Sequence, residues 1–342
     1  MVVNSSKTIN LALQGGGSHG AFTWGVLNRL LDEERLQYEA ISGVSSGAMN
    51  AVLFADGYMK GGSEGAKQSL SDFWKAVASE YNDLFESSPV SIWNKAVGLD
   101  YPGTLDSYLS LTEKFSPYEL NPFNLNPLKN IVQEHVDFNG LKKFAGIALH
   151  IGATEVRTGK MRVFTNKELS ADVLLASACL PSLHHAIEIN GEAYWDGAFS
   201  GNPPLYPLIF NSKRSDILVV LLQPLSRNSL PKSVEEIRKR TNELSFNNTF
   251  LREMRAIALS KDKIKESWLG TGSLEKKISR LNIHVIEDRK FRNMDSNSRY
   301  NAGSDFIHEL YSQGNKHTSR WLKKNLSEIG KRSTIDLVKT FV

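Results

Sequence analysis

The sequence has only one cysteine among its 342 residues, Cys179. A single cysteine cannot form a disulfide within the chain, which fits a reducing compartment. The first ten residues hold no apolar stretch long enough for a signal peptide. No segment approaches the roughly 20 apolar residues that a membrane-spanning helix needs. We therefore expect a cytoplasmic protein, with any membrane contact peripheral.

The sequence also has little net charge, because 41 basic residues are nearly balanced by 37 acidic ones, leaving +4. Nucleic-acid binding calls for a clustered basic face, which this balance does not predict. The basic excess is partly local, in the tail from Lys316 onward. Such runs are most often solvated helix faces, and a weak affinity for anionic membranes is the second interpretation.

Internal repeats and recognisable linkers are absent, and a composition of 41% hydrophobic and 23% charged residues is that of a folded protein. Length alone favours two domains of about 150 residues, but α/β folds often exceed that size as one unit. We expect a single domain over residues 1–342. Its core would span about 8–225, and a helical C-terminal extension about 230–342.

Strand and helix patterns alternate along the core. Short strand patterns at residues 9–13 and 38–42 flank a helical pattern, and a buried helix is expected after the second strand. Further elements are predicted as a hairpin of 145–156 with 161–165, a strand pattern from 187 to 195, a buried strand at 217–222, an amphipathic helix at 237–258 and a last strand at 281–286. This alternation predicts an α/β fold with a mainly parallel sheet covered by helices.

The pattern weakens between residues 61 and 127, which hold nearly half of the 11 prolines. The aromatic residues of this stretch are Phe85, Trp93, Tyr101, Tyr108, Phe115, Tyr118 and Phe123. An aromatic insertion broken by prolines is either a structural cap with its own small core or a lid over a site. The sequence leaves both interpretations open.

The segment Gly43-Val44-Ser45-Ser46-Gly47 fits the G-x-S-x-G pattern between a predicted strand and a predicted helix. The chain turns so sharply there that only glycines at both ends, Gly43 and Gly47, leave room for the strained serine. The turn places Ser45 at a helix N-terminus, where free N–H groups and the helix dipole favour developing negative charge. Ser45 is the predicted nucleophile, and the backbone N–H of Ser46 is a predicted oxyanion donor.

A second glycine motif, Gly15-Gly16-Gly17-Ser18-His19-Gly20, also lies between a strand and a helix. It matches the G-x-G-x-x-G dinucleotide fingerprint, which further requires an acidic residue at the end of the next strand. That strand ends in the serine motif instead, and Glu39 lies at its start. We therefore interpret the motif as an oxyanion loop, in which the N–H groups of Gly15, Gly16 and Gly17 point at a tetrahedral intermediate.

A serine hydroxyl needs a proton acceptor. Of the eight histidines, only His284, His308 and His317 follow in the order Ser, Asp, His of α/β-hydrolases, and none lies in a recognisable turn motif. The other candidate is Asp196, which begins the turn Asp196-Gly197-Ala198 at the end of a strand pattern. An aspartate with an ordinary pKa near 3.9 is a poor base unless water is excluded, and the neighbours Trp195 and Phe199 make that possible.

These three motifs, in this order, resemble the patatin-like phospholipase family. The resemblance covers about residues 9–222 and includes Ala176-Ser177-Ala178-Cys179-Leu180-Pro181, typical of the segment before the family's aspartate. It implies a three-layer α/β/α sandwich and a Ser–Asp dyad, in which Ser45 attacks a lipid ester and Asp196 relays the proton without metal or cofactor. The glycine loop would form the oxyanion hole. Many members carry arginine where this chain has His19, which we interpret as a loop-packing residue.

The leading hypothesis is a serine lipid acyl hydrolase that cleaves esters of phospholipids, lysophospholipids or neutral lipids. Two alternatives stay open: acyl transfer to an alcohol through the same dyad, and nucleotide binding by the Gly15–Gly20 loop with Ser45 incidental. Adjacent histidines, His184 and His185, suggest a metal only weakly, because neighbours on a strand point to opposite faces. The sequence does not give the oligomeric state, head-group preference or acyl chain length.

Overall fold

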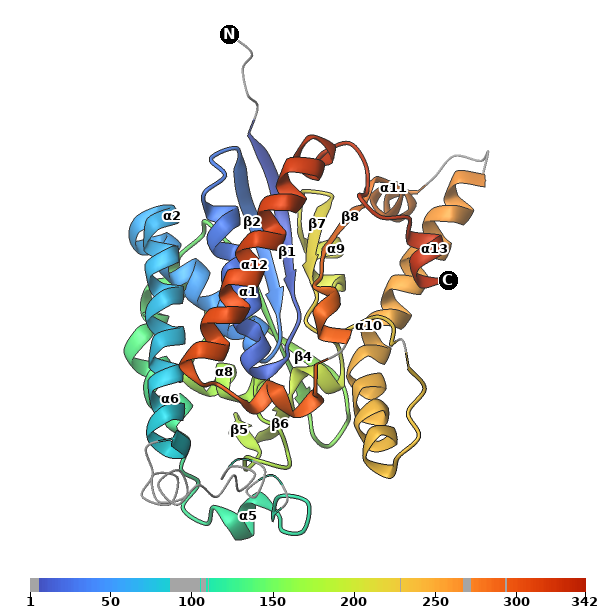
Figure 1. Ribbon diagram of the computed structural model, residues 1–342. Coiled ribbons are helices and arrows are strands. Elements are labelled where there is room, and N and C mark those ends of the chain that lie inside the picture. Colours follow the sequence, from blue (N-terminus) through green and yellow to red (C-terminus); the bar gives the residue numbers. More distant parts are fainter. Residues whose placement is uncertain are drawn as a thin grey trace.

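The computed structural model describes residues 6–86, 105, 109, 111–227, 229–266, 272–292 and 294–342. These residues form an eight-stranded sheet with helices on both faces (Figure 1). The strands are β1 (Lys7–Leu13), β2 (Leu36–Gly43), β3 (Ala148–Glu155), β4 (Met161–Thr165), β5 (Ile187–Ile189), β6 (Glu192–Asp196), β7 (Asp216–Val220) and β8 (Asn282–Ile286). Their order is β5-β6-β3-β2-β1-β7-β8, with β4 paired to β3 outside that path.

The centre of the sheet is parallel and one end of it is antiparallel. Strand β1 pairs in parallel with β2 and β7, and the parallel pairing continues to β3 and β8. The hairpin β3–β4 and the last strand β8 confirm the sequence predictions. The pattern from 187 to 195 is a hairpin rather than one strand, because Asn190 and Gly191 both take positive φ and turn the chain between β5 and β6.

The helices form a layer on each face of the sheet. They are α1 (Gly20–Leu31), α2 (Ser46–Tyr81), α5 (Pro117–Leu120), α6 (Pro127–His135), α7 (Phe138–Lys143), α8 (Ala171–Ser177), α9 (Tyr206–Asn211), α10 (Val234–Glu266), α11 (Ser273–Arg280), α12 (Ser304–Asn325) and α13 (Leu337–Phe341). Alternate residues of β1 point to opposite faces: Leu11 and Leu13 join one core with α1, α2 and α12, and Ala12 joins another with α9, α10 and α13. The protein is thus the predicted three-layer α/β/α sandwich.

The boundary expected at residue 61 differs from the structure. Helix α2 bends at Gly61 and Gly62, where the backbone leaves helical geometry, and then continues to Tyr81. Its second half buries Leu70, Phe73 and other apolar side chains in the core, so residues 61–81 belong to the helical layer. Trp93, Tyr101 and Tyr108 lie outside the described residues, and the choice between cap and lid stays a prediction.

The helix predicted at 237–258 is confirmed as part of α10. Its expected apolar face is only partly buried, because Ile237 and Leu244 are 49% and 47% exposed. The C-terminal extension is mainly helical, but it also contributes β8 to the edge of the sheet. Among the helices that the structure describes, none has the length and apolar character needed to cross a membrane.

Candidate active site

Ser45 lies in the sharp turn between β2 and α2, as the sequence predicts. Its φ of 54° and ψ of −130° are in a region that residues with a side chain rarely adopt. The turn is tight because α2 begins against the end of β1: a methyl group on Gly47 would lie 2.2 Å from the carbonyl oxygen of Leu13. The Ser45 N–H donates to both the carbonyl and the hydroxyl oxygen of Ser177, which ends α8. The backbone of Ser45 is therefore fixed both by the close contact between α2 and β1 and by its hydrogen bonds to Ser177.

Asp196 ends β6 and is buried, with 2% of its surface exposed. Its side chain accepts a hydrogen bond from the Ala198 N–H at 2.8 Å. Burial raises the pKa of Asp196 to about 7, while hydrogen bonds from Ala198 and the Ser45 side chain, together with the charge of Arg299, act to lower it. Such a carboxyl group is a far better proton acceptor than an ordinary aspartate.

Phe199 was expected to help exclude water, but it is 40% exposed. Asp196 is nevertheless buried, and it lies in the wall of a cavity of about 220 Å³ that also contains Ser45. One side of this cavity is apolar, formed by Met49, Phe73, Trp74, Val77, Leu128, Leu180 and Leu183. The reacting groups thus lie beside a surface suited to a hydrocarbon chain.

The four predicted oxyanion donors are not equivalent. The Gly15 N–H donates to Asn202 Oδ1 at 2.7 Å, and the Gly16 N–H to Ser46 Oγ at 3.1 Å, so both brace the loop. The N–H groups of Gly17 and Ser46 have no hydrogen-bond partner among the described residues, and both residues line the cavity. These two are the donors that remain open to an oxyanion.

The remaining motif glycines are required by space. A methyl group on Gly15 would lie 2.8 Å from Ser45 Cβ, which shows how closely the loop approaches the serine. Methyl groups on Gly20, Gly43 and Gly197 would lie 2.3 to 2.6 Å from neighbouring atoms. All of these distances are shorter than a van der Waals contact.

His19 is a packing residue, as we interpreted it from the sequence. It is 7% exposed and stacks near Phe291, and its Nε2 lies 2.8 Å from Ser298 Oγ. Burial and the nearby charge of Arg299 lower the pKa of His19 to about 3. The imidazole is therefore neutral at physiological pH.

The three histidines that follow Asp196 in the sequence do not form a triad with Ser45. His284 contacts Asp216 and His317 contacts Asp288, and neither they nor His308 line the cavity with Ser45. His184 and His185 lie in a loop before β5 rather than on a strand. Within the described part of the chain, no cluster of three or more His, Cys, Asp or Glu residues has the geometry to hold a metal ion.

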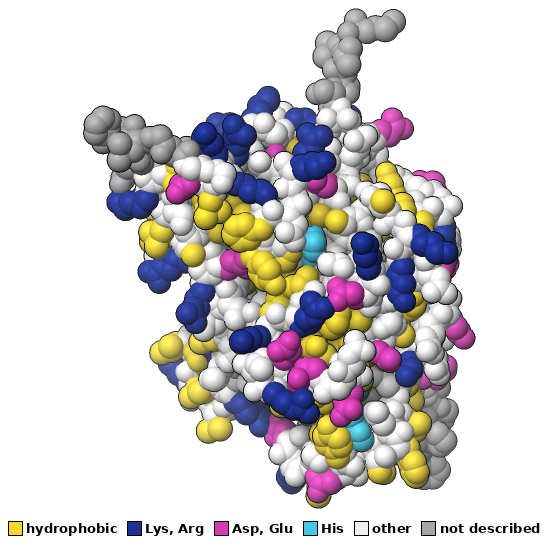
Figure 2. All heavy atoms as spheres, turned by 180° about the vertical axis from the view of Figure 1, so that it is seen from behind, with side chains coloured by type: hydrophobic (Ala, Val, Ile, Leu, Met, Phe, Trp, Pro, Cys, Tyr) yellow, Lys and Arg dark blue, Asp and Glu magenta, His cyan; other side chains and the backbone are white. Residues whose placement is uncertain are grey.

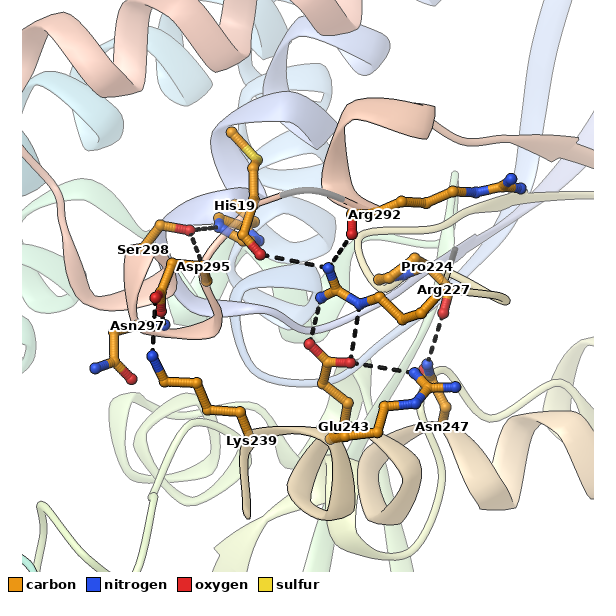
Figure 3. A network of polar contacts seen from close by, with 12 residues as sticks. His19, Pro224, Arg227, Lys239, Glu243, Asn247, Arg292, Asp295, Asn297 and Ser298 are labelled. Atoms are coloured by element: carbon orange, nitrogen blue, oxygen red, sulfur yellow. Dashed lines mark hydrogen bonds and ion pairs between the residues drawn. The ribbon is translucent and has the colours of Figure 1, made fainter. Parts of the chain in front are cut away.

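A network of polar contacts fastens the C-terminal extension to the glycine loop (Figure 3). Figure 3 shows His19 pointing toward Ser298, whose neighbour Asp295 pairs with Lys239 of α10 at 2.8 Å. Arg227 pairs with Glu243 of α10 and donates to the Arg292 carbonyl. The glycine loop that lies beside Ser45 is thus supported by residues more than 200 positions later in the chain.

The network brings Arg299 into the wall of the cavity, a residue that sequence reasoning missed. It lies in the C-terminal extension, far from any motif, and no local pattern distinguishes it. Asn202 also lies outside the three motifs, yet its side chain fixes Gly15. The Gly15 and Gly16 N–H groups are bonded within the protein, so the loop offers a phosphate fewer backbone donors than the nucleotide alternative assumes.

The comparisons with known proteins agree with this fold. The chain belongs to the patatin-like phospholipase family, whose model matches residues 11–209, more than half of the sequence. This membership supports activity as a lipid acyl hydrolase. Strands β7 and β8, helices α10 to α13 and Arg299 all lie beyond the matched range.

No curated protein matches the sequence. The solved structures similar to it include VipD and ExoU. VipD from Legionella pneumophila has a TM-score of 0.42 and 13% identity, covering 92% of this chain and 66% of its own, slightly under two thirds. The type III effector protein ExoU has a TM-score of 0.29 and 14% identity, covering 99% of this chain and 79% of its own.

Proposed function

We propose that this protein hydrolyses carboxylic esters of lipids through an acyl-enzyme on Ser45. The observation that carries the proposal is a buried carboxyl, with a pKa of about 7, in hydrogen-bond contact with a strained serine. Both groups line a cavity with an apolar wall. A proton acceptor, a nucleophile and a hydrophobic binding surface are the parts that this reaction requires.

In the proposed mechanism, ionised Asp196 accepts the hydroxyl proton of Ser45 as the serine oxygen attacks the ester carbonyl. The negative charge on the carbonyl oxygen is stabilised by the N–H groups of Gly17 and Ser46 and by the N-terminus of α2. Asp196 then protonates the leaving alcohol. In the second half, Asp196 takes a proton from the water that attacks the acyl-serine ester. It then returns this proton to the Ser45 oxygen as the C–O bond breaks, which releases the fatty acid and restores the Ser45 hydroxyl and ionised Asp196.

The proposed substrates are phospholipids or lysophospholipids in preference to neutral lipids. The apolar wall suits an acyl chain, and the guanidinium of Arg299 provides positive charge in the same cavity. Arginine binds phosphate well because its N–H groups form a planar fork. An uncharged glyceride has no group that uses this charge.

The proposed activity also calls for contact with a lipid surface. Phe123 and Leu125 are 84% and 70% exposed. Their segment packs through Tyr118 and Pro117 against the loop that contains His185, next to the cavity wall. Exposed apolar side chains beside a lipid site are suited to insertion at a membrane interface.

Vesicle flotation tests this contact. We expect the double variant Phe123→Ser/Leu125→Ser to bind phosphatidylcholine vesicles more weakly than the unaltered protein. The matched control is Leu230→Ser/Val234→Ser, a pair that is 80% and 85% exposed near the start of α10. Equal binding by both variants would show that the segment is not the membrane contact.

The direct test of the mechanism is covalent labelling with a fluorophosphonate, followed by peptide mass spectrometry. We expect label on Ser45, none in Ser45→Ala, and strongly slowed labelling in Asp196→Asn. The control is Asp172→Asn, since the Asp172 side chain is 52% exposed and does not line the cavity. Labelling of Asp196→Asn at the rate of the control would disprove the role of Asp196.

A further inference from the structure

A second hollow lies at the end of the sheet opposite to Ser45. It has a volume of about 500 Å³ and is lined by Ile209, Ser212, Lys213, Arg214, Ser215, Ser273, Lys276, Lys277, Arg280 and Leu281. These residues precede β7 and β8, at the edge where the parallel strands begin. Ser45 follows β2, at the edge where the strands end. The two sites are therefore separated by the length of the sheet.

The lining of this hollow carries charge of one sign. Five of its side chains are cationic, Lys213, Arg214, Lys276, Lys277 and Arg280, and no carboxylate is among the lining residues. Figure 2, a view from behind, shows Lys and Arg side chains gathered at the upper left, on the side where α11 lies. Like charges around one hollow repel each other, and a bound anion removes that repulsion.

The cations are not neutralised by the protein around them. Across the residues that the structure describes, none of the five forms an ion pair with Asp or Glu. The two carboxylate oxygens of Glu39 accept the backbone N–H groups of Lys213 and Arg214 and form no ion pair with their side chains. Lys277 donates to the carbonyl oxygen of Phe210, which is uncharged.

A buried hydroxyl gives a second, independent sign of a ligand. Ser212 lines the hollow and is 5% exposed, yet its Oγ has no hydrogen-bond partner in the described structure. Buried hydroxyl groups are nearly always hydrogen-bonded, because an unpaired one has lost its hydrogen bonds to water without replacement. An anion oxygen in the hollow would supply the missing acceptor.

We propose that this hollow binds a soluble phosphate compound with several negative charges, such as one carrying a di- or triphosphate group. Five cations and a free hydroxyl match several phosphate oxygens better than a single charge. The ligand is a free compound rather than a lipid head group, because a membrane at this edge would hold the catalytic cavity away from its substrate. The site is separate from the catalytic one.

Calorimetric titration with inorganic tripolyphosphate tests the proposal. We expect saturable binding to one site, weakened about tenfold or more in Lys276→Ala/Arg280→Ala, because the double variant loses two cationic hydrogen-bond donors from the lining. A smaller loss is expected in Ser212→Ala. The control Lys323→Ala/Lys324→Ala removes two exposed charges from α12 and should change affinity less than about twofold.

Three outcomes would overturn the proposal. One is the absence of saturable tripolyphosphate binding, and another is an equal loss in the control, which would show unspecific charge attraction. The third is binding to phosphatidylglycerol vesicles without binding to tripolyphosphate, which would make the ligand a lipid surface. Labelling of Ser45 at an unchanged rate in the hollow variants would show that they are folded.

Discussion

Two demands on Asp196 oppose each other at the scale of the single residue. Burial favours the neutral carboxylic acid, but a proton acceptor must be ionised. The Ala198 N–H, the Ser45 hydroxyl and the charge of Arg299 act to lower the pKa, and burial outweighs them. The resulting pKa of about 7 keeps a large share of the carboxyl ionised near neutral pH while making it a stronger base than a solvated aspartate.

The rate of ester hydrolysis should therefore depend on pH through this group. We expect kcat/KM on a soluble ester to rise with pH, with a midpoint near the Asp196 pKa of about 7. Arg299→Ala removes a charge that lowers this pKa, so its midpoint should move to higher pH, while Arg299→Lys should stay close to the unaltered protein. Profiles of the three proteins check this, and an unmoved midpoint in Arg299→Ala contradicts it.

Stability should depend on the same carboxyl in the opposite direction. The folded pKa of about 7 lies above the ordinary value of 3.8, so the folded state holds a proton that the unfolded state has released between these pH values. Asp196 thus destabilises the fold increasingly as pH rises through this window, by at most about 4 kcal/mol above pH 7. Asparagine stays neutral and still accepts from the Ala198 N–H.

We accordingly expect Asp196→Asn to raise the Tm at pH 8 and to raise it much less at pH 5, although it removes activity. Thermal unfolding at the two pH values measures this. Asp172→Asn, an exposed change of the same kind, should give no such difference. An equal Tm change for Asp196→Asn at both pH values would show that the buried charge is not the cause.

At the scale of elements, the site depends on how closely the end of β1 approaches the start of α2. The contact leaves no space for a side chain at Gly47, whose missing methyl group would lie 2.2 Å from the Leu13 carbonyl oxygen. The same approach positions the glycine loop, which directly follows β1, beside Ser45. The position of Ser45 therefore depends on how β1, the glycine loop and α2 pack against one another.

Gly47→Ala should push α2 away from β1. We expect a loss of roughly 1–3 kcal/mol in the free energy of unfolding, together with a much larger loss in the rate of Ser45 labelling. Gly61→Ala is the matched control, because a methyl group there would have no atom within 4 Å. Denaturant unfolding and labelling kinetics compare the two variants, and similar behaviour would mean that the close approach does not hold the serine.

At the scale of the molecule, the catalytic cavity is completed by the C-terminal extension. Helix α12 lies across α1 (Figure 1), and the two backbones come so close that methyl groups on Gly25 and Gly314 would lie 2.0 and 2.1 Å from carbonyl oxygens of the other helix. The segment just before α12 contains Ser298, whose hydroxyl contacts His19, and Arg299, which lines the cavity. The packing of α12 against α1 thus places the positive charge of Arg299 near Asp196.

Gly314→Ala should separate α12 from α1 and loosen this arrangement. We expect a lower Tm, and at temperatures where the variant is still folded, a lower kcat/KM, because Arg299 is displaced. Lys316→Ala, an exposed change on the same helix, serves as control. Full activity of folded Gly314→Ala would show that the position of Arg299 does not depend on how α12 packs.

The sequence by itself determined the features that depend on neighbouring residues. The glycines around Ser45 define a strand–turn–helix unit, and the apolar patterns of β3, β7 and α10 define their secondary structure, because each is a local property of a few residues. The order of the three motifs placed Ser45 and Asp196 as candidates. None of this needed a contact between distant segments.

Only the tertiary structure decided which groups around the serine are free to act. Gly15 and Gly16 look the same as Gly17 in the sequence, but Asn202 and Ser46 occupy their N–H groups and leave that of Gly17 open. Arg299 enters the cavity from a segment that no motif connects to it. The pKa of Asp196 follows from burial by all of these segments together, so it is fixed only when the whole chain has folded.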